Sequence, residues 1–277
     1  MVNKNKKPSM ASGLTKEPEK KNDGKSKISL RKLSKTAAYI VAIAIFGSIA
    51  LFTTVVVLAN TSSIRSSNAQ YERLREIAEN VEAESNEYET TQLSPLDHEM
   101  LQINPDYIGW LRVDGTNIDY PVVRGADNKE YINTSFYGDK NITGSIFMDY
   151  RVVGDFLTYN AEDSLPHIII YGHNLQRGGM FSDLHKFRNE QFLNENRKIT
   201  LIIHDQTVEF EIFSARLSDV NDPAYFINFN APQAFPRFAN RVDAPLRATQ
   251  IITLSTCTSR GSNDERMIVQ GYRVFSG

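Results

Sequence analysis

The chain has 277 residues, of which 41% are hydrophobic and 23% are charged; this is an ordinary balance for a globular protein. The composition excludes a chain that is disordered throughout, a collagen-like fibre and a polytopic membrane protein. A single cysteine excludes a disulfide framework within the chain and a Cys-rich zinc site. The formal net charge of −2 hides a strong asymmetry between the two ends of the chain.

The first 59 residues combine a basic tail with an uncharged apolar stretch. Residues 1–36 hold eleven Lys and Arg and three acidic residues, a net charge of +8, which leaves −10 for residues 60–277. Residues 37–59 carry no charge, and about 20 apolar residues suffice to cross a bilayer. A secretory signal peptide would have a shorter apolar core of about 7–15 residues, and a buried core helix of this length would include polar positions. The stretch therefore predicts an uncleaved transmembrane anchor.

The charges around this stretch predict its orientation. Arg31, Lys32 and Lys35 stand just before the uncharged residues, and positive flanks stay in the cytoplasm. We therefore expect a disordered cytoplasmic tail over residues 1–36 and an extracellular region over residues 60–277. Because that region is acidic, nucleic acid is not expected as a partner. No zinc-binding spacing is present, so metal catalysis is not expected. We expect no other cofactor.

Residues 60–93 are predicted to form a helical stalk. Much of this stretch lacks Gly and Pro, and its apolar residues recur at three- and four-residue spacing. They form one face: Tyr71, Leu74, Ala78 and Val81. This face predicts packing against the main domain, with a short coiled coil between chains as the alternative. A second helix is predicted to begin with Ser94 as its cap and Pro95 at its first position.

From Tyr107 onward the pattern is typical of short strands rich in Ile, Val, Tyr and Phe and bounded by Gly, Asn and Asp. The predicted strands are 107–113, 117–123, 144–149, 167–171, 199–204, 207–214, 250–256 and 266–275. Tight turns are predicted at Asp114-Gly115 and at 204–207. The predicted helical stretches between the strands are 127–134, 179–194 and 230–241. Eight short strands with few helices predict a mainly β domain, either a closed barrel or a sandwich.

Two of the apolar strands are followed by residues with reactive side chains. Cys257 ends the segment TLSTC, and His173 follows HIIIYG. A strand end holds a side chain in place and leaves it reachable. Each residue also has a structural alternative, because free cysteines are often buried and inert and many histidines are satisfied core residues. The remaining histidines fit structural roles better: His98, His167, His185 and His204.

Arg266 opens the last predicted strand, nine residues after Cys257. If these two strands are antiparallel neighbours, both residues lie at the same end of the sheet. Arg260, in the connecting loop, is the rival cation. Cys, His and Arg together suit acyl transfer, in which a thiolate attacks a carbonyl and a histidine moves protons. A permanently charged arginine can stabilise the resulting oxyanion.

These residues resemble the motifs of the sortases, the cysteine transpeptidases of Gram-positive cell surfaces. The similar segments are TLSTC (253–257), YGHN (171–174) and ERMIV (265–269). Two further segments resemble the class B branch of this family: GWLRVDGTNIDYPVV (109–123) and GSIFMDYR (144–151). The two helices expected before the barrel and a helix-bearing insert between residues 215 and 249 are similar to that branch too. The resemblance covers about residues 94–275. It implies an eight-stranded β-barrel with N-terminal helices and short helical insertions, behind a single transmembrane helix, with a catalytic domain over residues 94–277.

The resemblance also implies the chemistry of the site. Sortases cleave a sorting motif near the C-terminus of a secreted protein, form a thioester acyl-enzyme and pass the acyl group to an amine. By motif position, Cys257 is the implied nucleophile and His173 the implied general acid/base. Arg266 is implied to position the substrate and to stabilise the oxyanion.

The implied substrate contacts are Ser255, two residues before the cysteine, and Tyr225 and Phe226 in the insert. The implied partners are a secreted protein with an NPxTN-like or LPxTG-like motif and an amine acceptor, either a peptidoglycan precursor or a pilin lysine. Anchoring of proteins to the cell wall is the leading expectation. The alternatives are a pilus-assembling class B sortase, a cysteine peptidase that releases its products to water, and a non-catalytic surface-binding domain.

Overall fold

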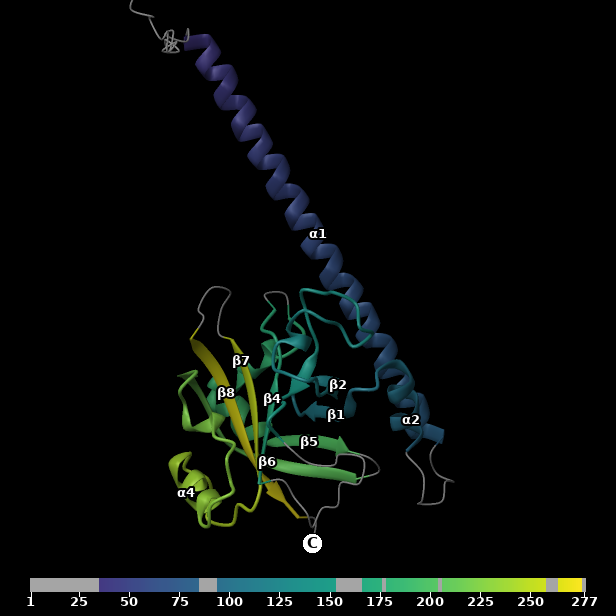
Figure 1. Ribbon diagram of the computed structural model, residues 1–277, viewed down its shortest axis with the longest axis vertical. Coiled ribbons are helices and arrows are strands. Elements are labelled where there is room, and N and C mark those ends of the chain that lie inside the picture. The colour runs from purple at the N-terminus through teal and green to yellow at the C-terminus, as the bar shows by residue number, and fades with distance from the viewer. Residues whose placement is uncertain are drawn as a thin grey trace, which may run out of the picture. The chain divides into compact units, whose positions relative to one another are not determined.

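The computed structural model describes residues 35–84, 94–152, 166–175, 178–203, 206–257 and 264–275. By its internal contacts the chain forms two units, Met1–Thr53 and Thr54–Gly277. The helix α1 (Lys35–Glu84) contributes residues to both (Figure 1). The predicted disordered tail, apart from its last residues, and the end of the predicted stalk lie outside the described residues.

Helix α1 is continuous over 50 residues, so the predicted span and the predicted stalk belong to one helix. The stretch Ala37–Val81 has the length and the hydropathy of a membrane span. Large apolar side chains are exposed along α1 from Tyr39 to Leu58. Within the described residues, α1 is the one candidate transmembrane helix, by length and composition.

In the part of the chain that the structure describes, eight strands close into a barrel in the order β1-β2-β3-β4-β7-β8-β6-β5. The strands are β1 (Tyr107–Val113), β2 (Asp119–Val123), β3 (Ile146–Met148), β4 (His167–Tyr171), β5 (Lys198–Ile203), β6 (Gln206–Asp219), β7 (Ile251–Cys257) and β8 (Glu265–Val274). Antiparallel pairing of β1 with β5 completes the circle, and β2–β3 and β4–β7 are parallel. The mainly β fold is confirmed, as a barrel and not a sandwich.

Strand β6 is longer than the sequence predicts. Its apolar alternation ends near Ser214, but the strand runs on to Asp219 in a ladder with β8, past a bulge between Ile212 and Ser214. The added half carries Arg216, whose guanidinium binds Asp222 Oδ1 at 2.7 Å and Gln270 Oε1 at 2.8 Å. Because the polar side chains of this half are hydrogen-bonded to partners in the folded protein, its sequence lacks the apolar alternation by which a strand is predicted.

The helices are shorter than predicted between the strands. Helix α2 (Pro95–Ile103) begins as expected, with the Ser94 hydroxyl accepting from Asp97 N. The predicted helix over 179–194 is two elements, because Asn189 is extended and caps the second by accepting from Phe192 N. The observed short elements are the 3₁₀ turns η1 (Glu130–Ile132), η3 (Ser182–Arg188) and η4 (Pro223–Tyr225) and the helices α3 (Glu190–Glu195) and α4 (Ala234–Arg241).

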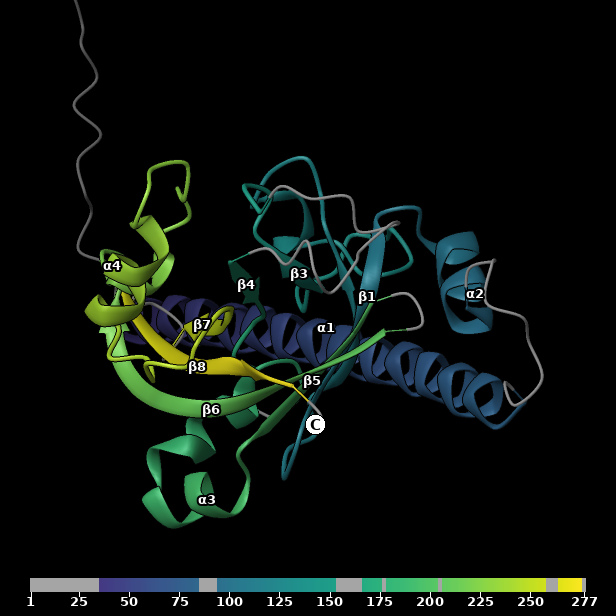
Figure 2. The same cartoon turned by 90° about the horizontal axis from the view of Figure 1, so that it is seen from below.

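The C-terminal part of α1 belongs to the same core as the barrel. Tyr71, Leu74 and Ala78 are buried in one cluster with barrel residues such as Trp110, and Val81 packs against it. The predicted apolar face therefore packs on the main domain. In Figure 2, α2 lies beside this part of α1, while α3 and α4 cover other parts of the barrel wall.

Candidate active site

The strand that ends at Cys257 lies beside the strand that carries Arg266. Strands β7 and β8 are antiparallel, and their register pairs Cys257 with Arg266. The two residues are therefore cross-strand neighbours at one end of the barrel, as the predicted pairing requires. The side chain of Cys257 and the rival cation Arg260 lie outside what the structure describes.

His173 follows the strand on the other side of β7. Strands β4 and β7 are parallel, with Tyr171 paired to Ser255. His173 stands two residues beyond Tyr171, and Cys257 stands two residues beyond Ser255. Because parallel strands end at the same edge of a sheet, three adjacent strands bring His173, Cys257 and Arg266 to one end of the barrel.

Gly172 allows the chain to stay close to β7 up to the residue before His173. Its amide donates to Ser255 O at 3.2 Å. A Cβ at this position would lie 2.5 Å from Ile146 Cδ1 and 2.7 Å from Phe181 Cγ, both core side chains. The packing therefore requires glycine, for lack of space and not because of an unusual φ.

The imidazole of His173 is held through one of its nitrogens. Its Nε2 lies 2.6 Å from the carbonyl oxygen of Ile132, at the end of η1. A carbonyl oxygen can only accept, so Nε2 carries the hydrogen, and Nδ1 is the nitrogen left to take up or release a proton. The backbone is held too, since Phe181 N donates to His173 O at 2.9 Å. The half-buried ring is thus fixed in orientation through Nε2 and through its own backbone.

Two of the predicted substrate residues meet each other. The Tyr225 hydroxyl lies 2.7 Å from Ser255 Oγ, and the Tyr225 ring stacks on Tyr171 with centroids 6.4 Å apart and planes 15° apart. Phe226, the third, packs instead against Phe229, with ring centroids 5.2 Å apart, and is 37% exposed. The structure thus brings Tyr225 to Ser255 and turns Phe226 toward the aromatic cluster beside α4.

An ion pair between the buried Asp149 and the exposed Arg151 contacts Tyr171 and was not predicted as part of the site. The Tyr171 hydroxyl donates to Asp149 Oδ2 at 2.8 Å, and Arg151 Nη2 donates to the same oxygen at 2.6 Å. Burial by itself raises the pKa of the fully buried Asp149, but the hydrogen bonds from Arg151 and Tyr171 hold it below its ordinary value. Burial and the Asp149 charge raise the pKa of Tyr171, which stays a donor. The sequence signal that could have indicated this ion pair is the segment DYR (149–151), directly after an apolar strand.

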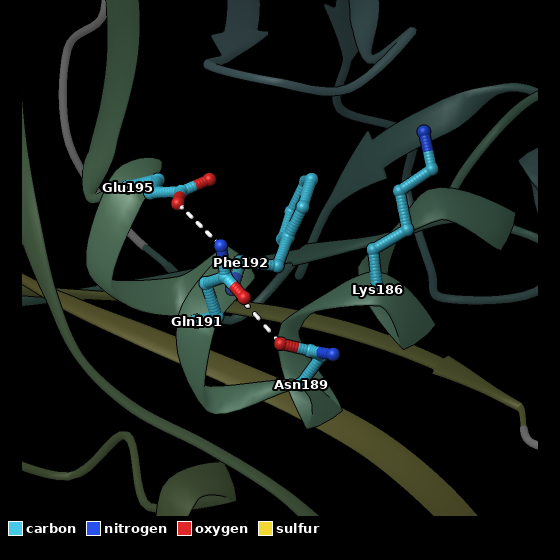
Figure 3. A pocket seen from close by; sticks show the side chains of 5 residues that line it. All are labelled: Lys186, Asn189, Gln191, Phe192 and Glu195. Atoms are coloured by element: carbon cyan, nitrogen blue, oxygen red, sulfur yellow. Dashed lines mark hydrogen bonds between the residues drawn. The ribbon is translucent and has the colours of Figure 1, made fainter.

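The pocket drawn in Figure 3 is formed by other residues. It is lined by Lys186, Asn189, Gln191, Phe192 and Glu195, from η3, α3 and the junction between them. Gln191 Nε2 donates to Glu195 Oε1 at 2.9 Å, and Lys186 Nζ lies 5.9 Å from the Phe192 ring centroid. No predicted site residue lines it. Across the described ranges, no group of three or more His, Cys, Asp or Glu could hold a metal ion.

Comparison with known proteins gives the family. The family model described as the sortase domain matches residues 111–274, more than half of the chain and nearly all of the barrel. This match shows that the chain belongs to the sortase family of cysteine transpeptidases.

The relatives narrow the assignment to the class B branch. Sortase B of Listeria monocytogenes is 32% identical over 188 residues, which cover 64% of this chain and 73% of the relative. Sortase B of Staphylococcus aureus is 27% identical over 210 residues, covering 73% and 82%. The crystal structure of Clostridium perfringens sortase B is 30% identical, covers 65% of this chain and all of its own, and superimposes with a TM-score of 0.55.

Proposed function

We propose that this chain is a membrane-anchored sortase in which Cys257 is the nucleophile, His173 the general acid/base and Arg266 the cation at the oxyanion. The register of β4, β7 and β8 carries the proposal, because it brings the three residues to one end of the barrel. The catalytic domain then spans residues 94–277, behind the stalk of residues 60–93.

The reaction follows from the types of these residues. The Cys257 thiolate attacks the carbonyl carbon of the scissile peptide bond in the sorting motif, and Arg266 stabilises the negative oxygen that forms. His173 gives a proton to the leaving amine, so the C–N bond breaks and a thioester remains. The acceptor amine then attacks the thioester, His173 takes its proton, and Cys257 is released. A peptide bond to the acceptor replaces the bond that was cut.

The groove for the sorting motif is proposed to run along Tyr225, with Ser255, 2% exposed, directly beneath it and Phe226 at its margin. The hydrogen bond between Ser255 and Tyr225 joins the wall of β7 to the insert, and the stacked Tyr171 is fixed from behind by Asp149. An NPxTN-like or LPxTG-like motif of a secreted protein is the proposed substrate, and a peptidoglycan precursor is the proposed acceptor.

The membrane topology is proposed from the helix and the charges before it. Large apolar side chains of α1 are exposed between Tyr39 and Leu58, and a tail of charge +8 precedes them, so the tail stays in the cytoplasm. The single cysteine offers a direct test in intact cells. A thiol reagent that cannot cross membranes should label Cys257 in intact cells and leave the Cys257→Ala variant unlabelled. Labelling of Cys257 only after lysis would show that the catalytic domain lies in the cytoplasm.

The activity is tested by intact mass spectrometry of the full chain in detergent, incubated with a pool of sorting-motif peptides. We expect a thioester adduct that is absent in Cys257→Ala and that transfers to an added amine, and its mass identifies the motif. Competition between a wall-precursor amine and a pilin lysine identifies the acceptor. Hydrolysis of the motif peptide at a rate that does not depend on the amine concentration would indicate a peptidase. A folded chain with no adduct and no alkylation of Cys257 would indicate a binding domain.

The role of Arg266 is tested separately. Lysine cannot reproduce the planar fork of the guanidinium, so Arg266→Lys should lower the rate of acyl-enzyme formation about 100-fold. The matched control is Arg260→Lys in the loop, which should keep nearly the normal rate. A normal rate for Arg266→Lys together with a strongly lowered rate for Arg260→Lys would assign the stabilisation of the oxyanion to Arg260.

A further inference from the structure

Helix α1 bonds to Gly144, which packs against the carbonyl that orients the His173 ring. The Tyr71 hydroxyl donates to Gly144 O at 3.1 Å, and Tyr71 is 3% exposed. Gly144 has a φ of +57° and is packed so tightly that a Cβ would overlap the Ile132 carbonyl oxygen. That oxygen accepts from His173 Nε2 at 2.6 Å. One residue, Gly144, therefore stands between the helix and the hydrogen-bond partner of His173.

The segment around Gly144 is fastened to α1 over two helical turns before Tyr71. Ser67 Oγ lies 2.7 Å from Thr143 Oγ1, and the pair is buried. Ser63 Oγ donates to Asn141 Oδ1 at 3.1 Å. These bonds hold the segment on the helix, and through it the position of the Ile132 carbonyl.

The same face of α1 holds Tyr120 of β2. The Arg75 guanidinium lies 4.9 Å from the centroid of the Tyr120 ring, a cation–π contact. Arg75 Nε also donates to Asp119 O at 3.0 Å, and the Tyr71 ring meets Tyr120 edge-on at 5.1 Å. The Tyr120 ring is thus fixed from two sides by neighbouring turns of the helix.

Tyr120 in turn holds the loop that follows His173. Its hydroxyl oxygen accepts from Met180 N at 3.0 Å, and the next amide, Phe181 N, donates to His173 O at 2.9 Å. Met180 has a φ of +49°, which costs energy in a residue with a side chain and persists only where the surroundings impose it. The contact with Tyr120 is one such constraint. The helix therefore reaches His173 twice, through its ring and through its backbone.

We propose that Tyr71 and Arg75 are positioning residues for His173, so that the helix leading from the membrane is part of the catalytic scaffold. The proposal rests on the proposed role of His173 as general acid/base. The hydrogen bonds described for Tyr71 and Arg75 go to Gly144, Glu72 and Asp119, whereas the predicted groove residues Ser255 and Tyr225 bond to each other. Loosening these contacts should therefore misplace the proton-transfer group and leave the binding of the motif intact.

The test uses the full chain in detergent and compares Tyr71→Phe and Arg75→Gln with Glu79→Gln, a change on the exposed side of the same helix. Tyr71→Phe keeps the ring and loses the bond to Gly144. We expect each of the first two variants to lower kcat about 10-fold at unchanged KM, and the control to match the parent chain. The pH dependence of alkylation of Cys257 should also shift, because it reports the proton balance with His173.

A purely structural role would lower the melting temperature while kcat per folded molecule and the alkylation profile stayed the same, and that result would overturn the proposal. If Tyr71→Phe does not fold, Arg75→Lys decides, because it keeps the cation over Tyr120. It should restore most of the kcat that Arg75→Gln loses, and equal rates would refute the role of Arg75. A parent chain that forms no acyl-enzyme would refute the proposed function instead, and the alkylation profiles would still test the link between α1 and His173.

Discussion

Strand β4 begins with one histidine and is followed, two residues after its end, by another, and the surroundings of the two rings differ. His167 is 2% exposed; its Nδ1 lies 2.8 Å from Phe226 O, and its Nε2 lies 2.8 Å from Thr253 Oγ1. His173 is half-buried, and the hydrogen bond described for its ring uses Nε2. One ring has both nitrogens engaged inside the protein, and the other has one nitrogen held.

This difference separates a structural histidine from one suited to proton transfer. Burial lowers the pKa of His167 to about 4, so the ring is neutral at physiological pH. It lies 4.5 Å from the Phe238 ring centroid and fastens the insert to the barrel through the Phe226 carbonyl. His173 is oriented by a carbonyl through Nε2, and its proposed role in proton transfer falls to Nδ1. Residue type is the same at both ends of the strand, and the environment decides the role.

The largest expected effect is at the reactive end. His173→Ala should lower turnover about 1000-fold, because general acid/base catalysis is lost, while the barrel keeps its stability. Acyl-enzyme formation measured by mass spectrometry gives the rate, and circular dichroism gives the fold. Cys257→Ala should be equally inactive and folded. Unfolding of His173→Ala would make this ring structural and would remove the contrast with His167.

At the other end of β4, the expected loss is in stability. His167→Ala leaves a cavity and an unpaired Phe226 carbonyl, and should lower the free energy of unfolding by about 3 kcal/mol. Urea denaturation measures this loss, and His98→Ala on the exposed side of α2 is the control. Turnover of the folded molecules should stay within a few fold of the parent chain. A normal midpoint for His167→Ala would contradict the structural role.

The low pKa of His167 also predicts how stability depends on pH. The native ring stays neutral down to about pH 4, whereas the unfolded chain takes up this proton below about pH 6.5. The contribution is therefore full above pH 6.5 and falls as the pH drops toward 4, by about 3 kcal/mol in total. Denaturation curves between pH 4 and 7 measure it, and His167→Gln should lack this component. The lowered pKa of Asp149 also makes stability depend on pH, but below the window in which His167 titrates. A parent chain with no slope in this window would refute the assignment.

The smallest expected change in activity is at Tyr225, which precedes Phe226, the residue whose carbonyl bonds to His167. Tyr225→Phe keeps the stacking on Tyr171 and loses the hydrogen bond to Ser255. We expect KM for the motif peptide to rise a few fold, equivalent to about 1 kcal/mol, at unchanged kcat. Steady-state kinetics separates the two constants. An unchanged KM would place the motif elsewhere than along Ser255 and Tyr225.

Much of the architecture could be predicted from local patterns. The ranges of β1 and β4 and the start of α2 at Ser94 match the prediction, because short apolar runs and a Ser-Pro cap are signals within a few residues. The second half of β6 was missed because its polar residues are satisfied across the sheet. The 3₁₀ turn η1 is shorter than the helix predicted over 127–134, and its Tyr131 is held by Asn104 and Asp106, which lie far away in the sequence.

The sequence by itself determined most of the strands, the apolar stretch and the candidate residues for the chemistry, because periodicity and residue type are properties of short segments. It marked Cys257, His173 and Arg266 through strand ends and motifs. Only the tertiary structure decided that β7 lies between β4 and β8, that Asp149 accepts from Tyr171, and that Tyr71 bonds to Gly144, next to the Ile132 carbonyl that holds His173. Those contacts join residues far apart in the chain, and closure of the barrel selects them.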